Sequence, residues 1–224
     1  MKILPIINPY PIQQIYTDDQ KVKDEYALKC GFRKKMPEIK KAISSLDFAF
    51  QMADAHGSFA LSSALRMKLA DTPDFLDYKL EMKSQDSHDI YTYRHTPKES
   101  NENSICVEII NLGTKIPFGQ VVFHGGSFIG DAYPVVGGKY SLRKILSTTL
   151  DPQVASVHAS YHPENQCLWV ITIARTHGIP CYVLNIEDPE LGDEYEIILA
   201  DLTTATCTSL TKRKEQTVIE LQFT

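Results

Sequence analysis

Two glutamates at the start of an apolar run are the first residues of this sequence whose spacing suggests chemistry. The segment GDEYEIILAD, residues 192–201, places Glu194 and Glu196 on either side of one tyrosine. If the run is a strand, both side chains lie on one face, about 6.5 to 7 Å apart along the chain. Neighbouring carboxylates repel each other, so strands usually keep such charges apart. A cationic reaction centre would explain the pair, and two solvated glutamates at a strand end are the structural alternative.

Two further segments hold polar residues beside strand-like runs. VVFHGG ends its run at His124, and the glycines Gly125 and Gly126 would let the backbone approach a ligand closely. In KILSTTLDPQVA, Ser147 and Thr149 share one strand face. Each segment alone also fits an ordinary structural role, a turn histidine in the first case and strand surface in the second. We expect all three segments to meet in one cleft.

The first half of the chain is predicted to be helical. KKMPEIKKAISSLDFAFQMA repeats apolar residues at steps of three and four, which places them on one helix face: Met36, Ile39, Ile43, Leu46 and Phe50. SFALSSALRMKLA repeats leucines every four residues and follows a break at Gly57 and Ser58. Residues 83–104 are polar and are predicted to form a surface excursion. Helical spacing returns in SICVEIINLGTKIP.

After Gln120 the pattern changes to strands. β-Branched and aromatic residues cluster between turn residues in at least five segments: QVVFHGG, CLWVITIAR, IPCYVLNIE, YEIILADL and QTVIELQFT. One helix is predicted among them, in PQVASVHASY. Helices followed by strands favour an α+β domain with a mainly antiparallel sheet or sandwich.

Composition argues against several classes of partner and site. The 224 residues are enough for one well-buried domain, and their net charge of −5 offers no basic excess for nucleic acid. Five widely spaced cysteines without a CxxC pair indicate reduced, mostly buried thiols and neither a disulfide framework nor a zinc site. The histidines His158, His162 and His177 have no metal-ligand spacing, so no metal is expected.

The N-terminus does not resemble a secretory signal. Prolines at positions 5, 9 and 11 interrupt its short apolar run, and no small-residue cleavage site follows. No apolar stretch approaches the roughly 18 residues needed to cross a bilayer. We expect a protein that folds in the cytosol without a membrane partner, and that a secretion system would still be able to deliver into a host cell.

The order of the three polar segments resembles that of the mono-ADP-ribosyltransferase family. Members have a strand ending in arginine or histidine before glycine, then a Ser-Thr-Ser strand, then a Glu-x-Glu strand. IINLGTKIPFGQVVFHGG, LSTTLDPQVA and GDEYEIILADLTTATCTSL are similar to these motifs in this order. The resemblance covers Pro117–Phe223 and extends more thinly over the helical half. Upstream, LSSALR at residues 61–66 resembles the family helix that brings an arginine to the NAD phosphates.

The resemblance implies a single ADP-ribosyltransferase-like domain over residues 1–224. Residues 1–116 would form a mainly helical lobe packed on a β-rich NAD-binding core, residues 117–224, with a mainly antiparallel two-sheet arrangement. The implied activity is transfer of ADP-ribose from NAD to a target-protein side chain, with arginine as the leading acceptor. Nicotinamide would leave through an oxocarbenium-like transition state, and NAD would be the co-substrate.

The matched motifs imply roles for individual residues. Glu196 would hold the ribose 2′-hydroxyl and stabilise the developing positive charge, and Ser147 would orient Glu196. Glu194 would face the acceptor, and its proton affinity would be raised by Glu196. The residues implied to contact NAD are His124, Gly125, Gly126, Ser147, Thr148, Thr149 and Arg66.

One position departs from the Ser-Thr-Ser and Glu-x-Glu members. They carry arginine before the glycine, whereas His124-Gly125 resembles the His-Gly of diphtheria-type toxins and poly-ADP-ribose polymerases. A neutral imidazole does not replace a cationic fork at a phosphate, so His124 is expected to meet a ribose hydroxyl or an amide. Two alternatives therefore stay open. One is an NAD glycohydrolase, in which water replaces the acceptor, and the other is an inactive transferase-like binding module.

The target protein is not readable from the sequence. The loop NIEDPELGD lies where the family carries its target-recognition loop. Its acidic residues would attract a basic target surface: Glu187, Asp188, Glu190 and Asp193. A bacteriophage host-modifying enzyme and an injected bacterial effector are both compatible with these features.

Overall fold

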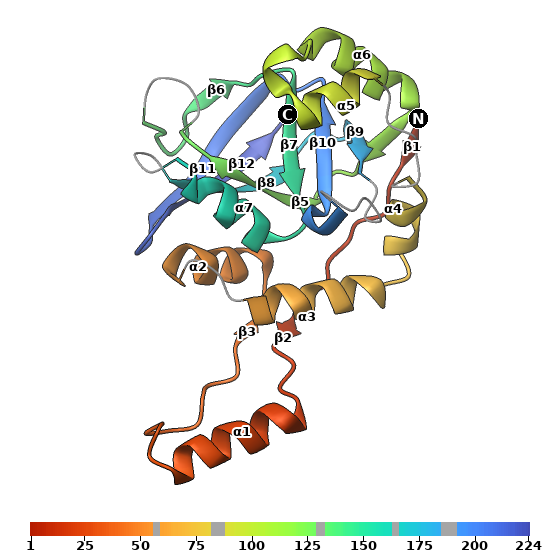
Figure 1. Cartoon of the computed structure of the whole chain (residues 1–224). Coiled ribbons are helices and arrows are strands. Elements are labelled where there is room, and N and C mark those ends of the chain that lie inside the picture. Colours follow the sequence, from red (N-terminus) through yellow and green to blue (C-terminus); the bar gives the residue numbers. More distant parts are fainter. Residues whose placement is uncertain (56–58, 82–87, 129–132, 163–165, 185–191) are drawn as a thin grey trace.

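Ten strands of the computed structural model form one hydrogen-bonded sheet, with helices above and below it in the view of Figure 1. The structure describes residues 1–55, 59–81, 88–128, 133–162, 166–184 and 192–224. The helices are α1 (Asp18–Lys29), α2 (Ser45–Ala55), α3 (Phe59–Ala70), α4 (Phe75–Glu81), α5 (His88–His95), α6 (Glu102–Leu112) and α7 (Pro152–Ser160), with 3₁₀ turns η1 (Pro97–Glu99) and η2 (Gly192–Glu194). The strands are β1 (Lys2–Ile3), β2 (Ile12–Gln13), β3 (Lys41–Ala42), β4 (Thr114–Ile116), β5 (Val121–Gly126), β6 (Lys139–Ser141), β7 (Ile145–Thr149), β8 (Cys167–Ile173), β9 (Ile179–Val183), β10 (Glu196–Ala200), β11 (Thr204–Lys212) and β12 (Thr217–Phe223).

The sheet consists of two halves that meet at one residue pair. Its order is β1-β4-β9-β10-β7-β5-β8-β12-β11-β6, and β2 and β3 form a separate ribbon. β1–β4 and β8–β12 are parallel neighbours, and the other neighbours are antiparallel. Between β7 and β5 the ladder is the single pair Phe123 with Thr149. Figure 1 shows β7 and β10 at a steep angle to β11 and β12, so the predicted α+β fold with a mainly antiparallel two-sheet core is confirmed in this form.

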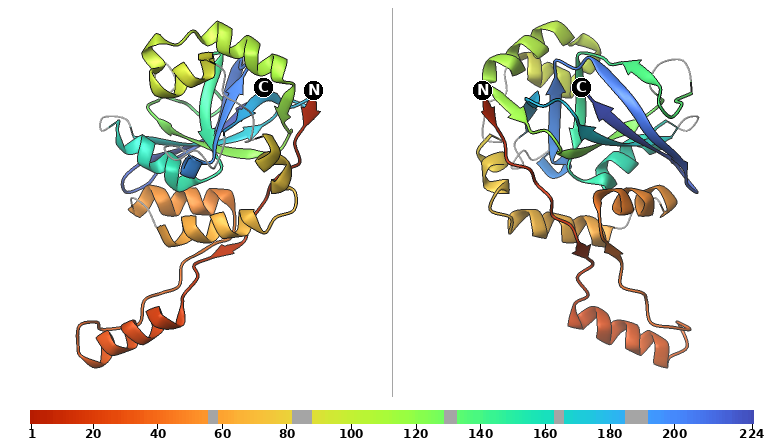
Figure 2. Two further views of the ribbon diagram at one scale, coloured as in Figure 1. Left: turned by 45° about the vertical axis from the view of Figure 1, so that its right-hand side comes forward. Right: turned by 180° about the vertical axis from the view of Figure 1, so that it is seen from behind.

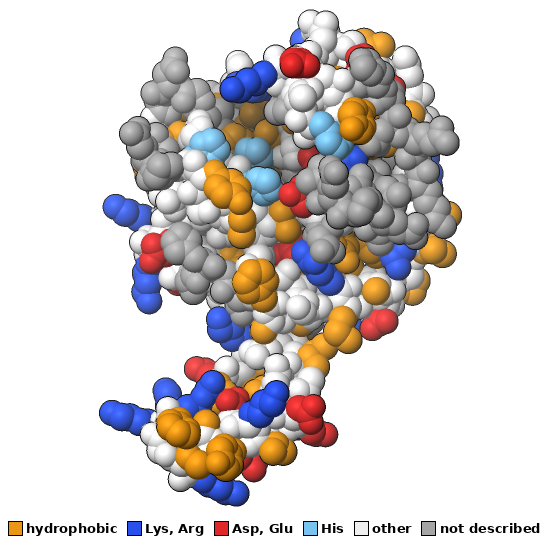
Figure 3. Space-filling model, in the orientation of Figure 1, with side chains coloured by type: hydrophobic (Ala, Val, Ile, Leu, Met, Phe, Trp, Pro, Cys, Tyr) orange, Lys and Arg blue, Asp and Glu red, His pale blue; other side chains and the backbone are white. Residues whose placement is uncertain are grey.

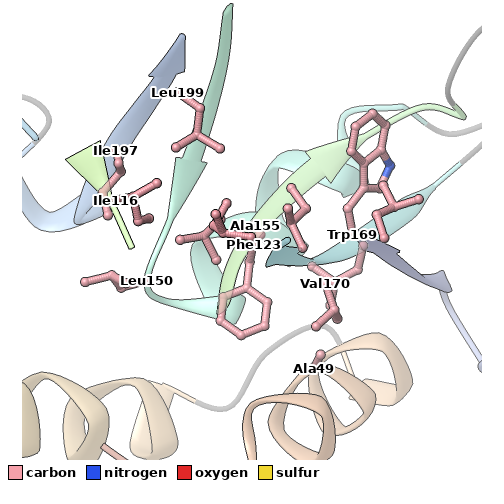
Figure 4. Close-up of a cluster of buried hydrophobic side chains, with 14 of the residues drawn as sticks. Ala49, Ile116, Phe123, Leu150, Ala155, Trp169, Val170, Ile197 and Leu199 are labelled. Carbon is pink, nitrogen blue, oxygen red and sulfur yellow. The ribbon is translucent and has the colours of Figure 1, made fainter. Parts of the chain in front are cut away.

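Helices cover both faces of the half of the sheet that contains β4, β9, β10 and β7. One hydrophobic cluster lies toward α2 and α3 and includes Ala49, Phe123 and Ile197 (Figure 4). The other joins α5 and α6 to the opposite face and includes Ile109 and Ile198. Successive residues of β10 therefore enter different clusters, and all five are buried. This burial on two faces explains why the strand is one apolar run without alternation.

The helix predicted over residues 34–53 exists only from Ser45 onward. The N–H of Asp47 donates to Ser44 Oγ at 3.1 Å, and the N–H of Ile43 donates to Asp47 Oδ2 at 2.8 Å. These reciprocal bonds cap the helix here. Before the cap, β3 pairs with β2, and Met36, Ile39 and Ile43 are exposed. The helical prediction for this part was wrong because a local cap and a strand pairing overrode the periodicity.

Most other predicted elements are confirmed. Leu61, Leu65 and Leu69 lie on the buried face of α3, while the predicted break at Gly57 and Ser58 lies outside the described residues. α6 and α7 form where helices were expected, as do the strands β5, β8, β9, β10 and β12. Part of the predicted surface excursion is wrong, because α5 is a helix. Its residue Ile90 is buried against α6. A single buried apolar residue produces no helical periodicity in the sequence, so the pattern did not predict this helix.

The prediction that the cysteines are mostly buried is confirmed. Cys106, Cys167, Cys181 and Cys207 are buried, whereas Cys30 is exposed, and all five are free. Within the described part of the chain, no helix has both the length and the apolar character needed to cross a bilayer.

A projecting arm, residues 14–40, was not predicted. Figures 1 and 2 show α1 standing away from the body at the end of the two chain segments that lead from β2 and into β3. Thr17 and Gln20 form a capping box at the helix start. None of the α1 residues, all of which the structure describes, is buried. The helix therefore rests on its caps and on polar contacts such as Arg33 with Asp24, at 3.1 Å.

Candidate active site

The gap between β5 and β7 brings the three predicted segments together. β10, β7 and β5 are consecutive in the sheet, but β5 and β7 separate beyond the one residue pair that joins them. His124 crosses this gap, because its Nδ1 lies 2.7 Å from the carbonyl oxygen of Ser147. His124, Ser147, Glu194 and Glu196 line one cavity of about 150 Å³.

Glu196 is the first residue of β10 and is only 8% exposed. It lies opposite Thr149 in the ladder, and Ser147 Oγ donates a hydrogen bond to its Oε1. Glu194 is not in the strand, since it ends the turn η2. Between the two, Tyr195 has a φ of 50°, in the left-handed region. The prediction that both glutamates share one strand face was wrong because the chain turns at Tyr195, although both line the cavity.

Burial raises the pKa of Glu196 to about 7. The hydrogen bond from Ser147 opposes this rise because it favours the charged form. The negative charge of Glu194 adds to the rise, and the positive charges of Arg94 and His158 oppose it.

His124 is a neutral imidazole with a fixed tautomer. Burial lowers its pKa to about 4. A carbonyl oxygen only accepts hydrogen bonds, so Nδ1 carries the proton that is donated to Ser147. The ring also meets Trp169 edge-on, with centroids 4.7 Å apart. Nε2 is left with a lone pair, which suits a hydroxyl or amide N–H donor.

The two glycines of the first motif make room for protein atoms. A Cβ on Gly125 would lie 1.7 Å from the carbonyl oxygen of Ala155 and 2.5 Å from the nitrogen of Ala159. Only glycine therefore lets α7 pack this closely on β5. A Cβ on Gly126 would lie 2.8 Å from His124 Nε2. The close approach foreseen for a ligand is made here by α7 and by the imidazole.

The threonines of the second motif connect β7 to β10 and to the turn η2. Thr148 Oγ1 donates to the carbonyl oxygen of Ile197 at 2.7 Å, and Thr149 Oγ1 donates to that of Glu194. Both residues line the cavity. A hydroxyl has a single proton to donate, so these two have none left for a ligand.

Arg66 reaches the site from α3 through a buried aspartate. Asp151 caps α7, accepts a hydrogen bond from Ser62 Oγ, and lies 3.5 Å from Arg66 Nε. Burial raises the pKa of Asp151, and the bond from Ser62 opposes the rise. The Arg66 guanidinium also lies over the Tyr195 ring, 5.3 Å from its centroid. Arg66 thus connects α3, α7 and the turn before Glu196, and sequence reasoning identified it without its partner Asp151.

Two larger grooves adjoin the cavity. One, of about 470 Å³, runs between α3 and α7 and is lined by Arg66, His158 and Glu194. The other, of about 560 Å³, shares His124 and Ser147 with the cavity and extends to Arg143. Figure 3 shows histidine side chains gathered on this face of the molecule beside acidic ones. The cavity therefore has space on both sides for a substrate larger than itself.

Two residues at the site carried no signal in the sequence. His158 on α7 lies with Nε2 3.3 Å from Glu194 Oε1, and the bond to Glu194 raises its pKa. Tyr93 on α5 is hydrogen-bonded to the backbone of Ser147, and burial raises its pKa to about 12. Both contacts join residues far apart in the chain, so only the assembled fold reveals them.

Some expectations fall outside what the structure describes. Glu187, Asp188 and Glu190 of the acidic loop, and the side chain of Asp193, lie outside the described residues. Across the described ranges, no group of three or more histidine, cysteine, aspartate or glutamate residues is arranged to hold a metal ion.

Sequence comparison finds no relatives, whereas structural comparison finds bacterial toxins. No protein-family model matches the chain, and neither does any curated protein. The ADP-ribosylating toxin BECa of a binary enterotoxin of C. perfringens, solved with NADH, superimposes with a TM-score of 0.48 and 12% identity, over 71% of this chain and 48% of its own. The enzymatic component C2-I of the C2 toxin from Clostridium botulinum gives a TM-score of 0.41 and 14% identity, over 67% of this chain and 46% of its own.

A shorter toxin is also similar. C3larvin, an ADP-ribosyltransferase from Paenibacillus larvae, gives a TM-score of 0.43 and 13% identity, over 66% of this chain and 93% of its own. This chain spans a little under half of the length of BECa and C2-I. At these low identities and TM-scores, we derive the chemistry of the site from its own geometry.

Proposed function

We propose that the chain is an NAD-dependent mono-ADP-ribosyltransferase with a single domain of that type. The observation that carries this proposal is the buried Glu196, hydrogen-bonded by Ser147 and lining one cavity with His124 and Glu194. The same residues match the family motifs in family order. A buried carboxylate is suited to stabilise a sugar cation, because charge interactions are stronger away from bulk water.

Glu196 would stabilise the transition state for cleavage of the bond between nicotinamide and ribose. As this bond breaks, its electron pair leaves with nicotinamide, and positive charge develops on the ribose. Ser147 holds one carboxylate oxygen, so the other is available to the 2′-hydroxyl. With a pKa of about 7, Glu196 is about half ionised at neutral pH, and the cationic nicotinamide ring would favour its charged form.

His124 and Arg66 would hold the rest of the dinucleotide. The lone pair of His124 Nε2 would accept from a ribose hydroxyl or from the nicotinamide amide. Arg66 lines the adjoining groove, where its guanidinium would meet a diphosphate oxygen. The backbones of Gly125 and Gly126 also border the space available to NAD. Thr148 and Thr149 would support the site through the strands they connect.

Glu194 would bind and deprotonate the acceptor. Its side chain is 30% exposed at the entrance of the cavity and already pairs with the imidazole of His158. A guanidinium would take the same place with better geometry, because its fork matches a carboxylate. The acceptor nitrogen would then bond to the ribose carbon, and its proton would pass to Glu194.

The proposal is tested by following both products of the reaction. The protein is incubated with NAD, with and without a cell lysate, and nicotinamide release is measured. Proteins from the lysate are then examined by mass spectrometry for ADP-ribosylated arginine. We expect modified arginine with wild-type protein and none with Glu196→Gln.

The other outcomes identify the alternatives. Nicotinamide release without modified protein would indicate a glycohydrolase. If the protein neither consumes NAD nor gains thermal stability from it, the binding-module alternative would replace the enzyme. Modification of a residue other than arginine would retain the transferase and reject the proposed acceptor.

A further inference from the structure

His158 is a third charged group at the pair of glutamates. It projects from α7, and its Nε2 lies 3.3 Å from Glu194 Oε1. Its side chain is 48% exposed and lines both the cavity that holds Glu196 and the groove between α3 and α7. None of the roles proposed above uses this histidine.

Two cationic groups oppose the glutamate charges at the cavity. With both glutamates ionised, the cavity would carry two negative charges, one of them buried. Arg94 of α5 and His158 each lower the pKa of Glu196, and the influence of Arg94 is the larger. Protonated His158 is the one that also lies 3.3 Å from Glu194. The charge of Glu194 raises the pKa of Glu196, and that of His158 lowers it, so the two act on Glu196 in opposite directions.

Other titratable groups face His158 from each neighbouring element. Glu194 comes from η2, Glu196 from β10 and His124 from β5. Arg66 of α3 lines the same groove and is committed to Asp151 and the Tyr195 ring. His124 stays neutral because burial lowers its pKa to about 4. Protonated His158 forms an ion pair with Glu194, and Arg94 of α5 also acts on the charge of Glu196.

We propose that His158 is a positioning residue that pairs with Glu194 and so lets Glu196 ionise beside it before an acceptor arrives. A cationic acceptor that binds Glu194 then replaces His158 as the partner of this carboxylate. Glu196 stays ionised, so its negative charge remains available to the sugar cation. The catalytic consequence rests on the proposed function, whereas the effect on Glu196 does not require NAD. His158 itself touches no reacting atom.

The test is a double-mutant cycle read as pH profiles. Nicotinamide release from NAD without acceptor is measured between pH 5 and 9, as kcat/KM, for wild type, His158→Gln, Glu194→Gln and the double variant. In His158→Gln the midpoint of the acid limb should rise by about one pH unit, because Glu196 loses a cation and keeps its neighbouring carboxylate. In Glu194→Gln it should fall by about as much, and the double variant should lie near wild type.

A structural role for His158 gives a different pattern. Loss of packing alone would lower kcat/KM at every pH and leave the midpoint in place. His177→Gln, the same change at a histidine on the loop after β8, should leave both the rate and the midpoint unchanged. The proposal is rejected if His158→Gln does not move the midpoint, or if the two single variants move it in the same direction.

The same four proteins allow a test that needs no turnover. Thermal unfolding is measured across the same pH range without NAD. A raised pKa makes the folded state lose stability as pH rises toward that pKa, and this applies to Glu196 and to His158, because Glu194 raises the pKa of both. Glu194→Gln removes this common cause, so it should lose less Tm between pH 6 and 8 than wild type. If wild type releases no nicotinamide, the proposed function fails. The thermal unfolding measurement does not depend on that outcome, and it still supports or rejects the inference about His158. Parallel Tm curves for all four proteins would reject it.

Discussion

Glu196 carries its charge in a buried position, which lowers the stability of the folded protein at high pH. Its folded pKa of about 7 lies above the ordinary value of 4.5, so the folded state binds this proton more tightly than the unfolded state does. The contribution of this proton to the free energy of unfolding is complete below about pH 4.5 and is lost as pH rises to about 7. The loss amounts to about 3 kcal/mol at most.

Glu196→Gln should therefore stabilise the protein at pH 8 by up to about 3 kcal/mol and change it little at pH 4. Urea unfolding at the two pH values measures the difference. Glu38→Gln, on an exposed stretch of the arm, is the matched control and should show no pH-dependent gain. An equal effect of Glu196→Gln at both pH values would mean that the carboxyl is not buried as described.

The same titration sets the pH dependence of the reaction. The proposed function requires ionised Glu196 as the active form, so kcat/KM for nicotinamide release should rise about tenfold per pH unit below pH 7 and level off above it. A pH series of initial rates measures this limb. A rate that is flat from pH 5 to pH 8 would contradict the assignment of Glu196.

The proposed role of Glu194 is separate from that of Glu196, and a single substitution tests it. At pH 8, Glu194→Gln should lower ADP-ribose transfer to arginine by about 10² or more, because the acceptor loses its base. Nicotinamide release without acceptor should keep nearly its wild-type rate. Measuring both activities on one preparation makes the comparison, and equal losses of the two would remove Glu194 from the acceptor step.

At the level of elements, α7 depends on a glycine of β5. Gly125→Ala would drive a methyl group into the backbone of Ala155, so it should destabilise the protein by about 3 kcal/mol or displace α7. Gly126→Ala meets the end of the His124 side chain instead and should disturb NAD binding more than stability. Thermal unfolding and NAD titration of the two variants separate these effects. Similar stability losses in both would contradict this account.

The sequence predicted the elements whose burial is uniform. The strands β8, β9 and β10 are apolar throughout because both of their faces are covered, and this pattern is visible without a structure. The leucine stripe of α3 is equally plain. The stripe through Met36 and Ile43 misled, because a cap at Ser44 and the pairing of β3 with β2 decided the local structure.

The candidate site was predictable in its members and not in its geometry. The order of His124, Ser147 and the two glutamates suggested that they meet, and they line one cavity. The turn at Tyr195, which takes Glu194 out of the strand, left no mark in the period of the run. The contact of His158 with Glu194 joins residues 36 positions apart in the sequence, so no local sequence pattern predicts it.

At the level of the whole molecule, the arm is separable from the body. All α1 residues are described and none is buried, and Figure 2 shows the arm clear of the body in two views. Ile12 and Ala42, at its base, are buried and belong to the core. Replacing residues 15–39 with a short glycine-serine linker should therefore change Tm by only a few degrees and leave nicotinamide release unchanged. Thermal unfolding and the rate assay check this, and loss of folding would mean that the arm stabilises the body.

The two halves of the sheet and the helices around them serve one purpose in this account. They hold a buried carboxylate at the junction, where Ser147 donates a hydrogen bond to it and His124 spans the gap. The adjoining grooves provide space for the remainder of NAD and for an acceptor. The central claim is that Glu196 stabilises the positive charge of the sugar at this junction.

Single-turnover nicotinamide release by wild type and by Glu196→Gln at pH 8 tests that claim most directly. NAD affinity is measured in parallel by thermal shift. We predict that Glu196→Gln folds and binds NAD within a few fold of wild type but releases nicotinamide about 10² to 10³ times more slowly. A Glu196→Gln protein that binds NAD and releases nicotinamide at the wild-type rate would contradict the account.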